Sequence, residues 1–333
     1  MLKEKKIFSI FLLCVSVFLF VSPYFILPSI YAGRDNWLDT APPNAVLLEL
    51  WNIDTFEGGS GSRAKYLEHR AYNYQKETFS TYVLVRSLTV SQAKAMLSGG
   101  AKPDLVSFGI GSGEIFKPFC EKLSPPNFVR ADLLQCGVVG KDVLAVPWCV
   151  GGYCLCADES VELSKESLQN LAQDKKVCTG GVYNVANLAL SEKVNVKLNN
   201  NYTQFEAYEA YLRGEYNVLL GTQRDFYRLN RKVENGVLGA VNFSYLTEFT
   251  DLIQVIAVCN AENKAVAEKF VEYLLTPSSQ MRLCDIGLFS VTDTQIYEDN
   301  YREFELAIKQ PKKVLSVFTP SENIKSLQGR GDD

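Results

Sequence analysis

LLELWNIDTFEGGSGSRAKYLEHRA, residues 47–71, is the stretch of sequence that decides the fold. It begins as an extended apolar run in which Glu49, Trp51 and Ile53 share one face. After a Gly/Ser turn, apolar residues recur every three or four positions up to Tyr74, which is the spacing of an amphipathic helix. A strand, a loop and a helix in this order begin an α/β unit.

The loop of this unit has the composition of a ligand-binding turn. Gly58, Gly59 and Gly61 lack a Cβ atom, so the backbone can come close to a bound molecule. Ser60 and Ser62 are candidate caps of the helix, whose free N–H groups favour an anionic or hydroxyl-rich ligand. The alternative is a tight turn that only starts a helix, because the loop matches neither the dinucleotide fingerprint nor the phosphate loop.

Residues 1–33 have the pattern of an export segment. Lys3, Lys5 and Lys6 precede a run from Ile7 to Gly33 without a charged side chain. Because about 20 apolar residues span a bilayer, this run is long enough for an uncleaved membrane anchor as well as for a signal peptide. The basic start predicts that the rest of the chain lies outside the cytoplasm, either anchored at the extracellular face of the cytoplasmic membrane or secreted.

Length and charge narrow the possible functions. The chain has 333 residues, and the part after the export segment is long enough for two globular lobes. Its formal net charge is -4, and the charges are scattered in sequence without a basic stripe. This argues against nucleic acid and against an acidic membrane surface as partners.

The cysteines are compatible with an oxidising exterior. Eight of the nine cysteines follow the export segment, an even number that permits disulfide pairs. The candidate pairs closest in sequence are Cys120 with Cys136 and Cys259 with Cys284. Spacing does not determine which thiols pair, so the connectivity stays open.

Strand and helix signals alternate through the first half of the chain. Tyr82–Leu88 is predicted to be a strand, Thr89 and Gln92 match a capping box at the start of a helix, and Asp104–Phe108 is predicted to be the next strand. Val143–Ala157 is extended and apolar and is predicted to be a crossing strand. The alternation is typical of a mostly parallel sheet covered by helices.

A second α/β unit follows in the second half. Thr203 and Glu206 match another capping box, and the strand Tyr216–Leu220 ends next to three polar side chains, those of Gln223, Arg224 and Asp225. In open α/β sheets ligands bind at the carboxyl ends of strands, so these side chains are candidate ligand contacts. A plain ion pair between Arg224 and Asp225 is the alternative.

The late part of the chain adds one more strand and two helices. Leu252–Val258 is extended and apolar. Thr276 and Pro277 start a helix by the cap-and-proline rule, and Gly287 ends it. The C-terminal segment Pro320–Asp333 is predicted to be frayed, and its Arg-Gly-Asp tripeptide is interpreted as chance.

The order of five motifs is similar to that of the extracellular solute-binding proteins of ABC importers, family 1, which contains sugar-binding receptors. These motifs are LELWNIDTFEGGSGSR, KPDLVSFG, AVPWCVGGY, GEYNVLLGTQRD and AEKFVEYLLTPSSQMRLCDIGLFSV. The resemblance implies an α/β, two-lobed, periplasmic-binding-protein-like (type II) fold whose lobes are joined by crossing strands and close on a ligand. The implied division is 1–33 as signal peptide or anchor, 44–148 plus 252–291 as first lobe, 149–251 plus 292–320 as second lobe, and 321–333 as a flexible tail.

Catalysis and metal binding have little support in the sequence. His69 is the only histidine and lies within the first helix, so it is interpreted as a helix-surface residue, and no Ser-His-Asp or Cys-His arrangement is expected. Cys154 and Cys156 point the same way in a strand-like run, without a nearby histidine, and are interpreted as small buried residues. We therefore expect no enzyme activity, no cofactor and no metal.

The sequence predicts a monomeric extracytoplasmic receptor that captures a small polar solute, a sugar being favoured, and delivers it to an ABC permease. Trp51 and Trp148 are candidate stacking faces for a sugar ring, with hinge packing as the alternative. The predicted ligand-binding residues are Trp51, Asp54, Glu57, Gly58, Gly59, Ser60, Phe108, Gly109, Trp148, Gln223, Arg224 and Asp225. Tyr153, Tyr183 and Tyr245 are weaker candidates. The alternatives are a glycan hydrolase, a binding protein for an oxyanion or ferric iron, and a sensor module.

Overall fold

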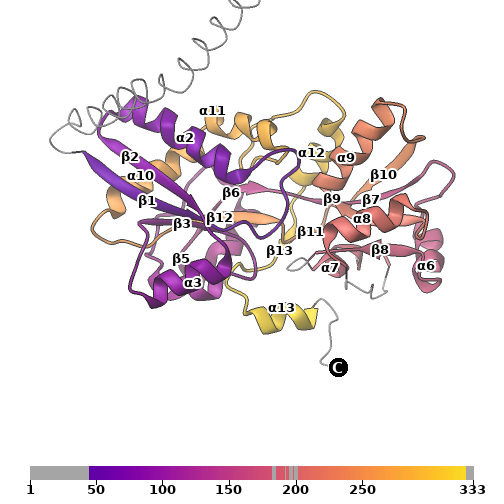
Figure 1. Cartoon of the computed structure of the whole chain (residues 1–333), viewed down its shortest axis with the longest axis horizontal. Helices are drawn as coiled ribbons and strands as arrows, with labels where there is room; N and C mark the ends of the chain where they lie inside the picture. The colour runs from indigo at the N-terminus through magenta and orange to yellow at the C-terminus, as the bar shows by residue number, and fades with distance from the viewer. Residues whose placement is uncertain (1–44, 182–184, 192, 195–197, 199–201, 328–333) are drawn as a thin grey trace, which may run out of the picture. The chain divides into compact units, whose positions relative to one another are not determined.

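Two β-sheets with helices against them organise the part of the chain that the structure describes (Figure 1). The computed structural model describes residues 45–181, 185–191, 193–194, 198 and 202–327. Of these, the residues from 47 to 327 belong to one unit. The predicted export segment, Tyr183 and the Arg-Gly-Asp tripeptide lie outside the described residues.

The first sheet has five strands in the order β2-β1-β3-β12-β6. Their bounds are β1 Val46–Asn52, β2 Thr81–Ser87, β3 Leu105–Phe108, β6 Val146–Val150 and β12 Ile253–Val258. Strand β1 pairs in parallel with β3, whereas β12 runs antiparallel to both β3 and β6. A late segment of the chain therefore completes the sheet that the first segments begin. We call the part built on this sheet the first lobe.

Amphipathic helices cover the first sheet on both sides. Figure 1 shows α2 above the sheet and α3 below it. In α2 the apolar face predicted from the sequence is buried, and the Ser62 side chain caps the helix by accepting a hydrogen bond from the amide of Lys65. Helix α3 begins with the predicted capping box of Thr89 and Gln92. The helix bounds are α2 Arg63–Thr78, α3 Val90–Ser98, α10 Lys264–Leu274, α11 Pro277–Met281 and η3 Arg282–Ile286.

Short elements fill the connection between β3 and β6. These are α4 Gly113–Phe116, η1 Lys117–Phe119, α5 Ala131–Leu134, η2 Gln135–Gly137, β4 Val138–Val139 and β5 Asp142–Val143.

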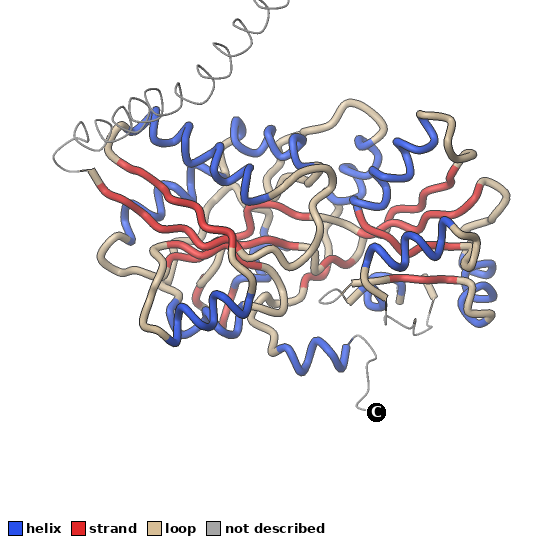
Figure 2. The backbone as a smooth tube through the Cα atoms, in the orientation of Figure 1, coloured by secondary structure: helices blue, strands red, loops and turns tan. Residues whose placement is uncertain are grey.

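The second sheet has four strands in the order β10-β7-β9-β8, and we call the part built on it the second lobe (Figure 2). The strand bounds are β7 Tyr153–Asp158, β8 Val177–Thr179, β9 Val218–Thr222 and β10 Val241–Tyr245. The helix bounds are α6 Lys165–Gln173, α7 Ala186–Leu190, α8 Gln204–Leu212 and α9 Gln223–Glu234. Because side chains alternate along β7, Tyr153 and Leu155 join the core that contains residues of α6 and α7. Cys154 and Cys156 are fully buried, with their Sγ atoms 3.6 Å apart.

Two crossings join the sheets, and the first differs from the prediction. Instead of one crossing strand over Val143–Ala157, the chain forms β6 and β7 with Gly151 and Gly152 between them. The two glycines interrupt the strand because there is no room for side chains: a Cβ atom at Gly151 would meet the Gln223 amide, and one at Gly152 would meet Ile308. The second crossing leads from β11 to β12, and β11 pairs in parallel with β13. These two short strands are β11 Phe249–Thr250 and β13 Lys313–Val314.

The C-terminal part is more ordered than the sequence predicts. Helix α12, Tyr301–Lys309, packs its Phe304 ring on Phe226 and Tyr245 of the second lobe. Part of the segment predicted to be frayed, 320–333, forms helix α13, Ser321–Leu327, which buries Ile324 in the core of the second lobe, and the prediction is wrong for that part. Ile324 and Leu327 are the two aliphatic side chains of the segment, too few to show a helical period. Residues 328–333 lie outside the described residues.

None of the eight described cysteines forms a disulfide, so neither predicted pair is bridged in the structure. The Cys259 thiol instead contacts Cys120, and its hydrogen bond to that neighbour, together with burial, raises the pKa of Cys259. Among the described helices, none combines the length and the hydropathy of a membrane span.

Candidate functional site

The loop after β1 is fixed to the first lobe by charge and by close packing. Arg63 is almost fully buried, and its Nε atom donates to Asp54 Oδ1 over 2.8 Å. The amide of Ser60 donates to the carbonyl oxygen of Ile286 over 3.0 Å. Gly59 lies so close to the backbone of Gly287 that a Cβ atom would overlap it, which explains why glycine occupies this position. These contacts hold the loop in one conformation, in which its carbonyl groups can accept hydrogen bonds from the second lobe.

The start of α9 is the matching element of the second lobe. Thr222 and Asp225 form a capping box in which the Thr222 amide donates to Asp225 Oδ2 over 2.9 Å. Asp225 is 1% exposed, and burial raises its pKa to about 6 although hydrogen bonds from Thr222 and Gln204 oppose this shift. Its ionic neighbour is Arg228 at 3.7 Å, so the predicted alternative of a pair with Arg224 is not the arrangement seen.

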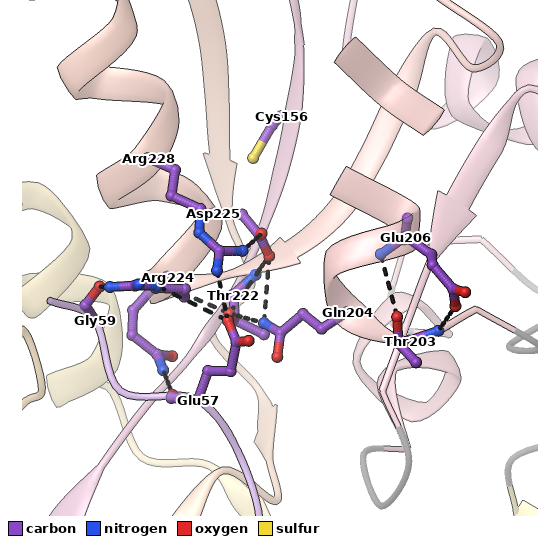
Figure 3. A network of polar contacts seen from close by, with 12 residues as sticks. Glu57, Gly59, Cys156, Thr203, Gln204, Glu206, Thr222, Arg224, Asp225 and Arg228 are labelled. Atoms are coloured by element: carbon purple, nitrogen blue, oxygen red, sulfur yellow. Dashed lines mark hydrogen bonds and ion pairs between the residues drawn. The ribbon is translucent and has the colours of Figure 1, made fainter. Parts of the chain in front are cut away.

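Three side chains of α9 reach the loop of the first lobe (Figure 3). Gln223 Nε2 donates to the carbonyl oxygen of Glu57 over 2.7 Å, and an Arg224 terminal nitrogen donates to that of Gly59 over 2.8 Å. Arg228 lies 3.3 Å from the Glu57 carboxylate, and Arg224 Nε lies 3.9 Å from it. We call these five residues the interlobe polar cluster. They include four predicted site residues, brought together from positions about 170 apart in sequence.

A second contact between the lobes is apolar. Ile110 of the first lobe is 3% exposed and belongs to the core of the second lobe, and Phe56 packs against the same core. Beside it, the Tyr153 hydroxyl donates to Asp251 Oδ1 over 2.7 Å, and the amide of Val185 donates to Asp251 Oδ2 over 3.1 Å. Burial raises the pKa of Asp251 to about 6.

An open pocket of about 580 Å³ borders the polar cluster. Ser60 and Gly287 of the first lobe line it on one side, and three tyrosines line it on the other. Tyr297 and Tyr301 stack with ring centroids 5.0 Å apart, and the Tyr301 hydroxyl is buried without a hydrogen-bond partner among the described residues. The third tyrosine is Tyr227, and the remaining lining residues are Cys284, Ile296, Glu298 and Asp299. Aromatic faces with nearby carboxylates and hydroxyls suit a hydroxyl-rich solute.

Both predicted stacking tryptophans are fully buried in the first lobe. The Trp148 ring stacks on Tyr66 with centroids 5.3 Å apart, and its Nε1 atom donates to Ser107 Oγ over 3.1 Å. Trp51 Nε1 donates to Glu49 over 3.0 Å. The structure thus favours the packing alternative for both rings.

Several other predicted residues also serve packing. Phe108 lies in an aromatic group with Phe116 and Phe318, and a Cβ atom at Gly109 would meet the Thr55 side chain. Gly58 has no room for a Cβ atom because the carbonyl oxygen of Gly61 lies 2.6 Å from that position. The weaker candidates Tyr153 and Tyr245 are held by Asp251 and by stacking on Phe304.

The sequence analysis missed Arg228 and the tyrosines of the pocket. For Arg228 a signal existed, because Thr222 and Asp225 have capping-box spacing, which starts a helix and puts Arg224 and Arg228 on one face. For Tyr227 and Tyr301 no local signal existed, since segments far apart in the chain converge there.

Metal-binding side chains are not clustered in the residues that the structure describes. No group of three or more His, Cys, Asp or Glu side chains among them is arranged to hold a metal ion. His69 is exposed on α2, as predicted, where its ring lies 3.2 Å from Arg70.

The two sheets, their crossings and the discontinuous first sheet define a two-lobed, periplasmic-binding-protein-like α/β fold. Solved structures with this fold match most of the chain. The GacH receptor of Streptomyces glaucescens, studied with acarbose, matches with a TM-score of 0.60 at 11% identity, covering 86% of this chain and 92% of its own.

Two other solved structures illustrate different ligands on the same fold. The galacto-N-biose-/lacto-N-biose I-binding protein of the ABC transporter from Bifidobacterium longum matches with a TM-score of 0.61 at 10% identity, covering 86% of this chain and 91% of its own. The Trichodesmium protein IdiA (FutA), in complex with iron and citrate, matches with a TM-score of 0.63 at 14% identity, covering 85% of this chain and 98% of its own. No family model and no curated protein matches the sequence.

Proposed function

We propose that the chain is the extracytoplasmic solute-binding component of an ABC importer, which captures a small polar solute between its lobes and delivers it to a membrane permease. The observation that carries the proposal is the interlobe polar cluster, in which Gln223 and Arg224 bind backbone carbonyls of Glu57 and Gly59. A ligand held by groups from both lobes favours the closed arrangement by its differential affinity for it. The protein acts as a monomer outside the cytoplasm, anchored or secreted.

The domain division proposed for this function follows the two sheets. Residues 44–148 plus 252–291 act as the first lobe and 149–251 plus 292–320 as the second. The place of β12 in the first sheet and the packing of α12 on the second lobe support this division. The crossings at Gly151–Gly152 and between β11 and β12 then serve as hinges.

A carbohydrate is the favoured ligand class. The pocket beside Ser60 offers stacked aromatic faces at Tyr297 and Tyr301 and carboxylates at Glu298 and Asp299. Sugars need both, since their C–H faces pack on aromatic rings while their hydroxyls hydrogen-bond to polar groups. Ferric iron is the alternative suggested by the tyrosines, but burial raises the pKa of Tyr301 and thus opposes the phenolate that would ligate iron.

A thermal-shift screen of the purified protein tests the proposal. The screen uses neutral sugars, acidic sugars, oxyanions, polyamines and ferric citrate, because any ligand of the folded state raises its melting temperature. We expect a sugar to raise it, and we expect Tyr301→Ala to reduce that shift. Leu84→Ala, at an exposed position of β2, is the matched control. No shift with any class contradicts the receptor function, and turnover of a chromogenic glycoside favours a hydrolase instead.

A further inference from the structure

Helix α9 gathers positive charge that is scattered in the sequence. Arg224, Arg228 and Arg231 follow at spacings of four and three, so they lie on one face of the helix, and Lys232 is next to them. These four side chains line an open pocket of about 480 Å³. The other lining residues are Tyr208, Tyr227, Asn235 and Val237, and none of the eight is acidic. We call this the basic pocket. Charges that are separated in the sequence are therefore gathered at one pocket in the folded chain.

Aromatic rings orient two of the guanidinium groups in the basic pocket. Arg228 lies over the Tyr208 ring at 5.2 Å from its centroid, and Arg231 lies over the Tyr227 ring at 5.7 Å. Arg231 also donates to the Tyr227 hydroxyl over 3.3 Å. Among the described residues, Arg231 and Lys232 have no ion-pair partner. The pocket thus holds positioned cations whose charge the surrounding protein only partly balances.

The Glu57 carboxylate occupies a position at which an anion contacts Arg224 and Arg228 of α9. It comes from the other lobe and lies 3.3 Å from Arg228 and 3.9 Å from Arg224 (Figure 3). These separations are longer than the roughly 2.7–2.9 Å of a strong charge-assisted hydrogen bond. Glu57 Oε2 is buried and has no hydrogen-bond partner among the described residues. A ligand anion able to approach the guanidinium groups more closely therefore competes well with Glu57.

We infer that the basic pocket binds the anionic group of a small acidic saccharide, a carboxylate or a phosphate. Arg228 and Arg231 bind the anion, Tyr227 flanks the sugar ring, and Glu57 is displaced when the solute enters. This inference names the substrate class of the proposed function and rests on it for the identity of the ligand as a small saccharide. Tyr227 lines both the basic pocket and the pocket beside Ser60, so the anion occupies the first while the rest of the saccharide extends into the second.

Titration calorimetry at low salt with three probes tests the inference. Trigalacturonate carries carboxylates, glucose 6-phosphate carries a phosphate ester, and maltotriose is neutral. We expect at least one acidic probe to bind about tenfold or more tightly than maltotriose, since charge-assisted hydrogen bonds are about twice as strong as neutral ones. We expect its affinity to fall as salt is added. Comparison of the two acidic probes identifies the anion.

Two variants and a charge-matched control assign the binding to this pocket. Arg231→Gln changes an exposed side chain and is expected to lower the affinity for the acidic probe about tenfold. Glu57→Gln removes the competing carboxylate and is expected to strengthen binding. Arg86→Gln removes one positive charge from β2 of the first lobe, at a half-exposed side chain, and is expected to leave the affinity unchanged. Circular dichroism confirms that each variant is folded.

The possible failures are distinguishable. Equal affinities of Arg231→Gln and Arg86→Gln for the acidic probe overturn the inference, and so does weaker binding by Glu57→Gln. If maltotriose binds and neither acidic probe does, the inference is wrong and the proposed receptor function stands. If no probe binds and no compound in the thermal screen shifts the melting temperature, both are wrong.

Discussion

The two lobes touch through two contacts of opposite character. At one, Ile110 belongs to the apolar core of the second lobe and Phe56 packs against that core. At the other, the interlobe polar cluster joins partly exposed groups, with 29% of the Arg224 side chain and 40% of the Glu57 side chain accessible to solvent. Separating the apolar contact exposes hydrocarbon to water, whereas separating the polar contact exchanges its hydrogen bonds for bonds to water at a small net cost. The comparison identifies the polar contact as the one that a ligand can replace.

The largest expected effect concerns the apolar contact. Ile110→Ala should lower the free energy of unfolding by about 2–4 kcal/mol, because it removes buried methyl groups and leaves a cavity where the lobes meet. Urea unfolding followed by circular dichroism measures the change. Leu84→Ala, at a half-exposed position of β2, is the control and should change stability by less than about 1 kcal/mol. Equal effects of the two substitutions would remove the distinction between the contacts.

The next effect is a dependence of stability on pH caused by buried carboxyl groups. Burial raises the pKa of Asp251 to about 6 in the folded protein, above its ordinary value in the unfolded chain. Between about pH 4 and pH 6 the folded state therefore binds more protons, so this group's contribution to stability is present below about pH 4 and is lost as pH rises through 6. The loss is about 2–3 kcal/mol.

Asp251→Asn should therefore make the fall in stability between pH 4 and pH 6 shallower, as urea unfolding at several pH values would show. Asp158→Asn is the control, because hydrogen bonds from the Ser160 amide and hydroxyl lower the pKa of that exposed carboxyl. The contribution of Asp158 to stability is lost as pH falls, the opposite of Asp251, and it changes at lower pH. An unchanged slope in Asp251→Asn would show that the carboxyl next to the apolar contact does not titrate as described.

The predictions from the sequence succeeded where a feature depends on residues that are close together in the chain. The buried face of α2 and the capping boxes at Thr89 and Thr203 are encoded within a few residues, and the sequence predicted them. The late motif ending at Gly287 was predicted as well, because a glycine with positive φ ends the helical segment there.

What the sequence did not predict depends on packing between distant segments. The pattern around Trp148 does not tell whether its ring points to solvent or to Tyr66. Likewise Ile324 and Leu327 are two aliphatic residues in a polar tail, and only the position of α13 against the second lobe buries Ile324. Four of the five residues of the interlobe polar cluster were therefore predictable as polar loops at strand ends, whereas the tyrosines of the pocket were not.

A smaller effect is expected at the hydrogen bond from Arg224 to the carbonyl oxygen of Gly59. Arg224→Ala should lower the free energy of unfolding by only about 0.5–1.5 kcal/mol, because water replaces the lost donor. Arg213→Ala, which breaks an exposed ion pair with Glu215 within the second lobe, is the control. A loss in Arg224→Ala as large as that in Ile110→Ala would mean that the polar contact is not readily exchangeable.

The smallest effect is expected for Glu57→Gln in the absence of ligand. The Glu57 side chain is 40% exposed and its contacts with Arg228 and Arg224 are long, at 3.3 and 3.9 Å, so their loss should change stability by less than about 1 kcal/mol. The change should shrink further in high salt, which screens exposed charges. Thermal unfolding at low and high salt measures both, and a large effect that is insensitive to salt would contradict the account.

The distance between the lobes tests the central claim most directly. Fluorescent labels attached through unnatural amino acids at Tyr72 on α2 and at Glu162 in the second lobe, both exposed, report that distance by single-molecule energy transfer. With the compound that shifts the melting temperature most, we predict a shift to one narrow population at shorter distance, with broader and longer distances in its absence. The same distribution with and without saturating ligand would contradict closure on a solute.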